Sequence, residues 1–143
     1  MAKSHAAVEA RDWNGLLRIA EAAMEQAWVR LPPHHFAAIA YEGLGDRQRA
    51  QFHRAWFDGL VRSILDSGDG RAAATAYVVI SIEEEYDVLA LRSLRRERQA
   101  LSQIEGRPYD VLTVIDREGR SSSVYFDITL MMARTPFAPT PSR

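Results

Sequence analysis

The sequence predicts an α+β fold in which three to four antiparallel N-terminal helices pack on a mostly antiparallel four-stranded sheet, built in the order strand, helix, strand, strand, strand. Two observations support this prediction. Apolar residues recur at helical spacing up to residue 66, whereas from residue 71 they alternate or form short β-branched runs. A polar turn at 117–120 then separates two alternating segments, which indicates an antiparallel hairpin.

The first helices are defined by caps and prolines. A short helix is expected over Ser4–Arg11, and Asp12 is a suitable N-cap for a second helix whose apolar residues continue to Leu31. Pro32 ends that helix because the residue before a proline is disfavoured in the α conformation. Pro33 suits the first turn of a third helix, which we expect to extend to Leu44.

The fourth helix has the clearest pattern in the chain. Asp46 caps it, and the Asp-Ser-Gly-Asp-Gly segment at 66–70 ends it. Its apolar stripe is wide enough to pack against the sheet, so we expect the helices and the sheet to share one core. The residues of the stripe are Phe52, Trp56, Phe57, Leu60, Val61, Ile64 and Leu65.

The helical half also contains a faint internal repeat. A shift of 34 residues places Asp12 on Asp46 and Ala27 on Val61, and this period is that of tetratricopeptide repeats. The helices on either side of Gly45 therefore resemble one tetratricopeptide hairpin, although Arg54 stands where that repeat has a large apolar residue. Any antiparallel helical hairpin would show much of the same pattern.

The second half predicts the sheet. Residues 74–82 are apolar on both faces, which is typical of an interior strand, and Ser81 begins a capping box for the next helix. Residues 99–105 suit an edge strand, and residues 110–116 and 122–130 form the hairpin. The expected organisation is thus a helical part at 1–66, a sheet unit at 71–132 and an unstructured tail at 133–143.

Composition excludes several classes of protein. The 143 residues include no cysteine, so a disulfide scaffold, a thiolate metal site and a cysteine nucleophile are excluded. Eighteen Lys and Arg against 19 Asp and Glu argue against a general nucleic-acid or membrane binder. No signal peptide or spanning segment is recognisable, and we expect a cytoplasmic protein.

The charged helix after Ser81 has two interpretations. Its acidic residues, Glu83 and Asp87 among them, and its later basic residues, Arg92, Arg95 and Arg96, complement the helix dipole at either end. The same residues are also our candidates for contact with a partner protein. Chelation by the acids is disfavoured because consecutive carboxylates point in different directions around a helix.

No catalytic or metal-binding motif can be assigned. The turn at 66–70 has neither the spacing of a calcium loop nor that of a phosphate-binding loop, and no Gly-x-Ser-x-Gly motif occurs. No two histidines have the spacing of helical metal ligands, and His34 and His35 should diverge on a helix. We therefore expect no catalytic residue, metal or cofactor.

Five residues remain as candidates for a pocket between the helices and the sheet: His34, His53, Tyr86, Asp110 and Asp127. Asp127 has apolar neighbours on its strand. If helices cover its face it would be desolvated, which is a feature of functional sites, and otherwise it is an outward polar residue, which we favour.

Several short motifs resemble an uncharacterised bacterial family known as domain of unknown function 4919. The motifs are Ser-Gly-Asp-Gly at 67–70, the strand at 75–80, Glu-Glu-Tyr at 84–86, Gln103, Tyr-Asp-Val-Leu at 109–112 and the strand at 124–128. The resemblance covers roughly residues 56–130, and the helical half is similar only in a generic way. It implies a natural module and brings no activity, cofactor or catalytic residue with it.

We expect a non-enzymatic protein-interaction module, such as the immunity protein or adaptor partner of a secreted toxin. The alternative is a small enzyme or ligand-binding protein that uses the pocket described above. A third possibility is pairing of the edge strand at 99–105 with a second copy, which the charges of Arg98 and Glu105 would discourage. We expect a monomer or a weak homodimer that binds neither nucleic acid nor membranes.

Overall fold

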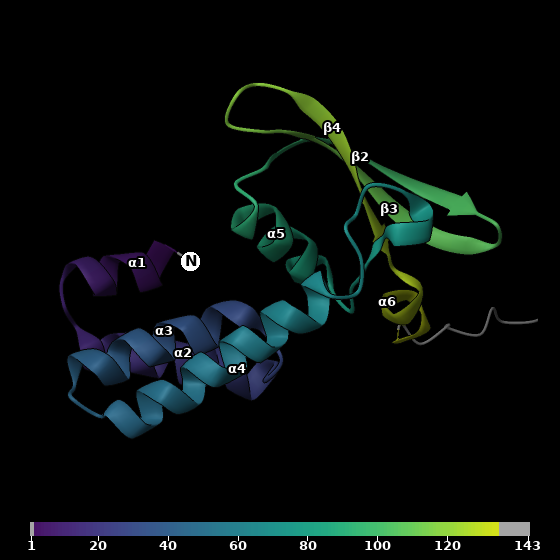
Figure 1. Ribbon diagram of the computed structural model, residues 1–143. Helices are drawn as coiled ribbons and strands as arrows, with labels where there is room; N and C mark the ends of the chain where they lie inside the picture. The colour runs from purple at the N-terminus through teal and green to yellow at the C-terminus, as the bar shows by residue number, and fades with distance from the viewer. Residues whose placement is uncertain (1, 135–143) are drawn as a thin grey trace, which may run out of the picture. The chain divides into compact units, whose positions relative to one another are not determined.

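The computed structural model describes residues 2–134, in which six α-helices precede, interrupt and follow a four-stranded sheet (Figure 1). The chain divides into two compact units, Met1–Ser63 (unit 1) and Ile64–Arg143 (unit 2). The expected α+β class, with helices first and strands second, is confirmed. The shared core of helices and sheet stays a prediction.

Unit 1 contains α1 (Ala2–Glu9), α2 (Trp13–Gln26), α3 (Leu31–Gly43) and most of α4 (Arg47–Leu65). The Asp12 side chain caps α2 as expected, with its carboxylate accepting a hydrogen bond of 2.8 Å from the Gly15 amide. Asp46 accepts a bond of 3.0 Å from the Arg49 amide at the start of α4. The predicted end of α2 is wrong: it stops at Gln26, and Leu31 already belongs to α3.

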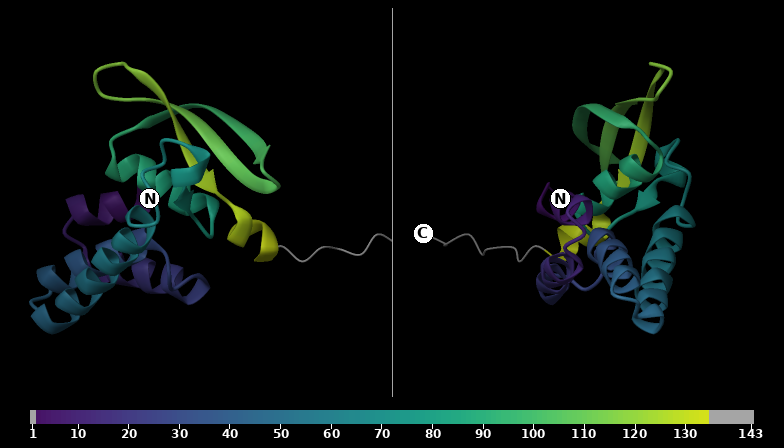
Figure 2. Two further views of the ribbon diagram at one scale, coloured as in Figure 1. Left: turned by 45° about the vertical axis from the view of Figure 1, so that its right-hand side comes forward. Right: turned by 90° about the vertical axis from the view of Figure 1, so that its left-hand side faces the viewer.

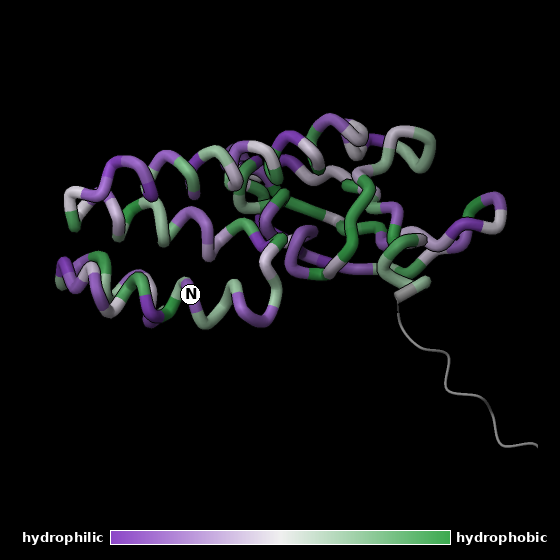
Figure 3. Tube along the Cα trace, turned by 90° about the horizontal axis from the view of Figure 1, so that it is seen from below, coloured by the Kyte–Doolittle hydropathy of each residue, from purple (hydrophilic) through white to green (hydrophobic). Residues whose placement is uncertain are grey.

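The core of unit 1 lies between α2 and α3. Leu16 and Met24 from α2 pack with Phe36 and Tyr41 from α3, and α4 adds Ala50. In Figure 3 the hydropathy colour alternates along the helices of this unit, as expected for helices with one buried side. The predicted apolar stripe of α4 is only partly buried: Ile64 is buried, whereas Phe52 and Trp56 keep 51% and 38% of their surface in contact with solvent.

Unit 2 contains the sheet, whose strands are ordered β1-β4-β3-β2. The strands are β1 (Tyr77–Val78), β2 (Arg95–Ile104), β3 (Arg107–Ile115) and β4 (Ser121–Asp127). The β2–β3 and β3–β4 pairs are antiparallel, and β1 is parallel to β4. The sheet is therefore mixed but mostly antiparallel, and β2 is an edge strand as predicted.

A 3-10 turn, η1 (Ala73–Thr75), stands where the sequence predicted part of a long interior strand. That prediction is wrong, because β1 has two residues and lies at the other edge of the sheet. Two of these apolar residues still contribute to the core, since Tyr77 and Val79 are buried in the unit. Val78 between them is exposed. Tyr77 and Val79 therefore lie on the buried side of this edge strand, and Val78 lies on its exposed side.

The remaining helices of unit 2 are α5 (Ile82–Leu91) and α6 (Thr129–Arg134). Ser81 caps α5 as expected, accepting a bond of 3.4 Å from the Glu84 amide. Two predicted boundaries are wrong. Helix α5 ends at Leu91, so Arg95 and Arg96 lie on β2 and cannot complement the dipole of this helix. Strand β4 ends at Asp127, so Leu130 lies on α6, where half of its surface is exposed.

The core of unit 2 combines one face of the sheet with α5, which lies against it in both views of Figure 2. Leu112 and Val114 on β3 share that face with Phe126 on β4, and Val88 and Leu89 of α5 are also buried. In the predicted tail, residues 133 and 134 belong to α6, and residues 135–143 lie outside the described part of the chain.

Candidate functional site

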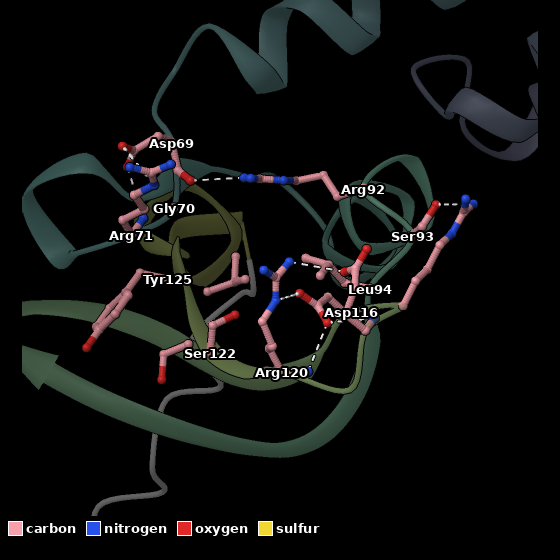
Figure 4. Close-up of a pocket in the computed structure, with 14 residues that line it drawn as sticks. Asp69, Gly70, Arg71, Arg92, Ser93, Leu94, Asp116, Arg120, Ser122 and Tyr125 are labelled. Carbon is pink, nitrogen blue, oxygen red and sulfur yellow. Dashed lines mark hydrogen bonds and ion pairs between the residues drawn. The ribbon is translucent and has the colours of Figure 1, made fainter.

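Unit 2 contains a groove of about 760 Å³ that we call the arginine groove (Figure 4). Four segments line it: the turn after α4, the end of α5, the β3–β4 turn and the adjoining part of β4. These segments contribute Asp69–Arg71, Arg92–Leu94, Asp116–Glu118 with Arg120, and Ser122–Tyr125.

The turn after α4 forms the first wall of the groove. The Asp69 carboxylate accepts bonds from the Thr75 hydroxyl at 2.6 Å and the Arg71 amide at 3.0 Å, and the Thr75 bond is the main cause that lowers the pKa of Asp69. Gly70 has φ +70°, a conformation that glycine adopts without steric cost. Its carbonyl accepts a bond of 2.9 Å from the Tyr125 amide, which fixes the turn to β4.

Arg92 extends across the groove from the C-cap position of α5 (Figure 4). Its Nη1 donates to the Asp69 carbonyl oxygen at 3.2 Å and to the Tyr77 hydroxyl at 2.6 Å. Both acceptors are uncharged. Within residues 2–134 no carboxylate forms an ion pair with Arg92, so its positive charge is not neutralised by contact.

The β3–β4 turn forms the opposite wall. The Asp116 carboxylate accepts bonds from the amides of Glu118 and Arg120, both at 2.9 Å, and from Arg120 Nε at 2.7 Å. The bond from the Arg120 amide is the main cause that lowers the pKa of Asp116. Arg117 donates at 2.7 Å to the Ser93 hydroxyl and, like Arg92, forms no ion pair with the described residues.

These contacts give the groove a positive character. Four arginines and three carboxylates line it, and Asp69 and Asp116 are already engaged by backbone and side-chain donors of their own turns. The guanidinium groups of Arg92 and Arg117 bind neutral oxygens, and Ser122 and Ser123 add hydroxyl groups. Such a set of donors is suited to an anionic ligand.

A second cluster of polar groups lies inside unit 2, between α5 and the sheet. Glu85 on α5 and Asp110 on β3 are only 1% and 5% exposed. Gln99 Nε2 donates to Asp110 Oδ2, whereas Glu85 Oε1 and Asp110 Oδ1 are buried without a hydrogen-bond partner in the described residues. Burial, reinforced by the charge of Asp110 and opposed by that of Arg96, raises the pKa of Glu85 to about 8.

Arg96 acts on Glu85 through its charge, and neither Glu85 nor Asp110 is among its hydrogen-bond or ion-pair partners in the described residues. Its Nη1 donates to the Tyr86 hydroxyl at 2.5 Å and to Gln99 Oε1 at 2.8 Å, and its guanidinium carbon is 5.2 Å from the centre of the Tyr86 ring. Tyr86, Arg96, Gln99 and Asp110 therefore form one chain of contacts from the surface to the buried pair.

Unit 1 has its own buried polar pair. His34 Nδ1 and His53 Nδ1 are 3.0 Å apart, and His34 Nε2 lies 2.7 Å from the Trp28 carbonyl oxygen. Because a carbonyl only accepts, neutral His34 carries its proton on Nε2, and His53 then donates from Nδ1. Trp56 stacks on His34 and Tyr41 stacks on His53. Burial is the main cause that lowers the pKa of both histidines.

The structure thus joins two pairs of the predicted pocket residues. His34 meets His53 in unit 1, and Tyr86 is linked to Asp110 in unit 2. Asp127 belongs to neither pair: it accepts a bond of 2.9 Å from the amide of Thr129, the first residue of α6, and forms an ion pair of 3.7 Å with Arg107. A pocket between the helices and the sheet stays a prediction.

Of the partner-contact candidates, only Arg92 lines the arginine groove. Glu83, Arg95 and Arg96 are exposed, and Asp87 is half-buried. Glu85 lies in the first turn of α5 as expected, but its side chain is buried, and burial raises its pKa. The groups of three or more acidic, histidine or cysteine side chains that a metal ion requires are not found in the described residues.

Sequence reasoning missed Glu85 and the groove residues Arg117 and Arg120. For Glu85 a signal existed, because it precedes Val88 and Leu89 by three and four residues and so shares their buried face. For the two arginines there was none, since they lie in a turn that any polar residues would satisfy.

Comparison with known protein families matches residues 2–135 to the family described as domain of unknown function (DUF4919). The match includes the helical half, which the sequence motifs had left as only generically similar. No curated protein and no solved structure matches the chain. Among the described residues, no helix combines the length and apolar character needed to cross a membrane.

Proposed function

We propose that this chain, which belongs to the domain of unknown function 4919 family, is a non-enzymatic protein-interaction module that binds an acidic segment of a partner protein in its arginine groove. The observation that carries the proposal is that neither Arg92 nor Arg117 forms an ion pair with the described residues. Both guanidinium groups line the groove and bind only neutral oxygens. Carboxylates of a partner would supply the charged acceptors that these groups lack.

The character of the groove favours a peptide segment over a small molecule. Sites for small molecules are mostly apolar, with a few polar groups that fix orientation. Here arginines, carboxylates and serines predominate, and only Leu94, Val124 and Tyr125 are large apolar or aromatic side chains. A segment with several carboxylates would contact more of these polar groups than a single small anion.

Three further features complete the proposal. The helical half is a tetratricopeptide-like hairpin that offers a second surface to the same partner. The protein is cytoplasmic and of bacterial type, and its partner is a secreted toxin for which it serves as the immunity protein, or a protein for which it serves as an adaptor. These features rest on the helical spacing, the composition and the family resemblance.

The test uses an acidic peptide of six glutamates carrying a rhodamine label, with binding followed by fluorescence anisotropy. We expect the protein to bind it at low ionic strength, with affinity that falls as salt is added. The double variant Arg92→Glu, Arg117→Glu should weaken binding on the order of tenfold or more, because two attractive charges become repulsive.

Arg98→Glu is the matched control, because Arg98 is an exposed arginine on β2 outside the groove and its replacement makes the same kind of charge change. An equal loss of affinity in the control would show binding to net charge alone and would contradict the proposal. Equal affinity of the groove variant and the native protein would contradict it as well. Tight binding of inorganic phosphate with no binding of the peptide would instead favour the ligand-binding alternative.

A further inference from the structure

We propose that β2 is a docking edge, at which an extended, acidic segment of another protein adds to the sheet as a further strand. This edge is a different surface from the arginine groove, and the proposal does not rest on the function of that groove. It stands on three features of β2: backbone groups that point away from the sheet, an exposed leucine on the buried face of the sheet, and a net positive charge.

Pro108 on β3 shows which backbone groups of β2 face outward. Its carbonyl accepts a bond of 3.2 Å from the amide of Ile128, which directly follows β4, so the backbone of Pro108 points to the β4 side of β3. Gln103 is opposite Pro108 in the ladder and therefore has no backbone bond to it. The N–H and C=O groups of Gln103 must point to the other side of β2, away from β3.

The same orientation recurs at every second residue of this strand. The register of β2 with β3 is unbroken over residues 98–104, so the N–H and C=O groups of Gln99 and Leu101 also point away from β3. Residues 95–101 are exposed, and β2 ends the strand order β1-β4-β3-β2, so no strand of the described chain lies on this side. The resulting row of donors and acceptors is a template on which an extended segment can pair.

Leu101 shows that the buried face of the sheet is incomplete at this edge. It is opposite Asp110 in the ladder, so both side chains lie on the same face, and Asp110 is only 5% exposed. Leu101 nevertheless keeps 69% of its surface in contact with solvent. A neighbouring strand would place a side chain directly beside Leu101 and remove this apolar surface from water. Strand addition would therefore gain apolar burial as well as backbone hydrogen bonds.

The charge of β2 decides which kind of strand fits. The strand contains Arg95, Arg96 and Arg98 and a single carboxylate, Glu97. Arg96 is held by neutral side chains, and neither Arg95 nor Arg98 forms an ion pair with the described residues. A segment with carboxylates is attracted to this edge, whereas a second copy of β2 brings the same net positive charge against it. The edge therefore favours an acidic partner segment over a second copy of this chain.

The probe is a rhodamine-labelled peptide of seven residues in which glutamate alternates with valine and glutamate stands at both ends. When its central valine pairs with Leu101 in an antiparallel register, the valines lie on the face of Leu101 and one terminal glutamate lies opposite Arg98. We expect binding in fluorescence anisotropy. In NMR spectra of the complex, the amides of Gln99, Leu101 and Gln103 should become protected from hydrogen exchange, and unchanged exchange at these amides would overturn the proposal.

Two N-methylated versions of the peptide test the strand geometry. Methylation of the three valine amides removes the donors that face β2 in this register, whereas methylation of the three glutamate amides that follow a valine changes only the far edge. Both versions carry the same charges. We expect the first to lose affinity on the order of tenfold or more and the second to keep it. Equal affinities would overturn strand addition, because binding by charge alone does not distinguish the two edges of the peptide.

Variants of the protein separate this edge from the groove. Arg98→Glu should weaken binding of the alternating peptide on the order of fivefold or more, because the glutamate opposite this position is then repelled. The double variant Arg92→Glu, Arg117→Glu is the control and should have a smaller effect at about 150 mM salt, which screens distant charges. An equal or larger loss in the double variant would overturn the placement of the peptide on β2. Hexaglutamate has no strand-forming valine, so its binding to the groove stays a separate measurement.

Light scattering of the free protein at two concentrations tests the other occupant of the edge. We expect a monomer, since the like charges of two β2 strands oppose their pairing. A dimer that Leu101→Glu abolishes would show that a second copy occupies β2 and would overturn the proposal.

Discussion

At the scale of the single residue, the buried histidines of unit 1 show how one contact fixes the protonation of two side chains. His34 donates from Nε2 to the Trp28 carbonyl, which leaves its Nδ1 as an acceptor for the proton of His53. A second proton on His34 would remove that acceptor and place two N–H groups against each other. The pair is therefore stable only while His34 is neutral.

This arrangement predicts a loss of stability in mild acid. The pKa of each histidine is lowered in the folded state, so below pH 6.5 the unfolded chain binds more protons than the folded one, and stability falls as the pH decreases from 7 toward 5. Each proton contributes a slope of at most about 1.4 kcal/mol per pH unit. Urea unfolding at several pH values checks the prediction.

His53→Asn is the informative variant, because the asparagine amide can donate toward His34 Nδ1 and does not titrate. It should show a smaller slope than the native protein. His5→Asn is a matched control, because His5 is an exposed histidine in the same unit, and it should keep the native slope. A native slope in His53→Asn would contradict the assigned role of the pair.

The burial of Glu85 could be predicted from the sequence, but the environment that raises its pKa could not. Helical spacing places it on the buried side of α5 together with Val88 and Leu89. Asp110 is 25 residues away, and nothing in either sequence context specifies that its charge acts on Glu85. The effect of that charge on the pKa of Glu85 could not have been predicted without the pairing of α5 with the sheet.

At the scale of the element, caps and turns were the most predictable features. Asp12, Asp46 and Ser81 each cap a helix as their sequence contexts indicate, because these interactions join residues three apart. The ends of α2, α5 and β4 were predicted less well. Apolar residues beyond each end continue the pattern of the element, and only tertiary contacts decide whether they remain in it.

Substitution of two turn glycines by alanine distinguishes the effect of backbone strain on stability from the effect of a steric clash. Gly70 and Gly119 both have positive φ, at +70° and +80°, so alanine at either position is strained by about 1 kcal/mol. A Cβ at Gly119 would meet nothing within 4 Å, whereas one at Gly70 would lie 2.6 Å from the Tyr77 ring. Gly70→Ala should therefore destabilise the protein by about 1–3 kcal/mol more than Gly119→Ala.

The difference between these two variants is measured by urea unfolding under the same conditions. Gly119→Ala controls for the effect on the backbone, since both residues lie in turns of unit 2 and have positive φ. Equal destabilisation would mean that the turn after α4 moves to accommodate the methyl group. The position of the first wall of the groove would then be less fixed than the contacts of Gly70 indicate.

At the scale of the whole molecule, the arginine groove depends on three regions that are distant in sequence. The turn after α4, the end of α5 and the β3–β4 hairpin meet only because β1 pairs with β4 and α5 crosses between β1 and β2. The local sequence pattern identifies each segment as a turn or a helix end. The order of the strands in the sheet is what brings these segments together at one surface.

The sequence also predicts one shared core, and unfolding can test this prediction. All three tryptophans, Trp13, Trp28 and Trp56, lie in unit 1, so tryptophan fluorescence reports on that unit alone. Amide signals of β3 and β4 in NMR spectra report on unit 2. A shared core predicts that the two signals change at the same urea concentration, and two separate transitions would contradict it.

The sequence by itself determined the fold class, the order of helices and strands, most helix starts and the identity of the edge strand. These features follow from spacing and capping, which act between residues close together in the chain. Only the tertiary structure decided that Glu85 is buried within range of the charge of Asp110, that His34 meets His53, and that arginines without ion pairs line one groove. Such contacts join residues 19 or more positions apart, and they depend on how whole elements pack.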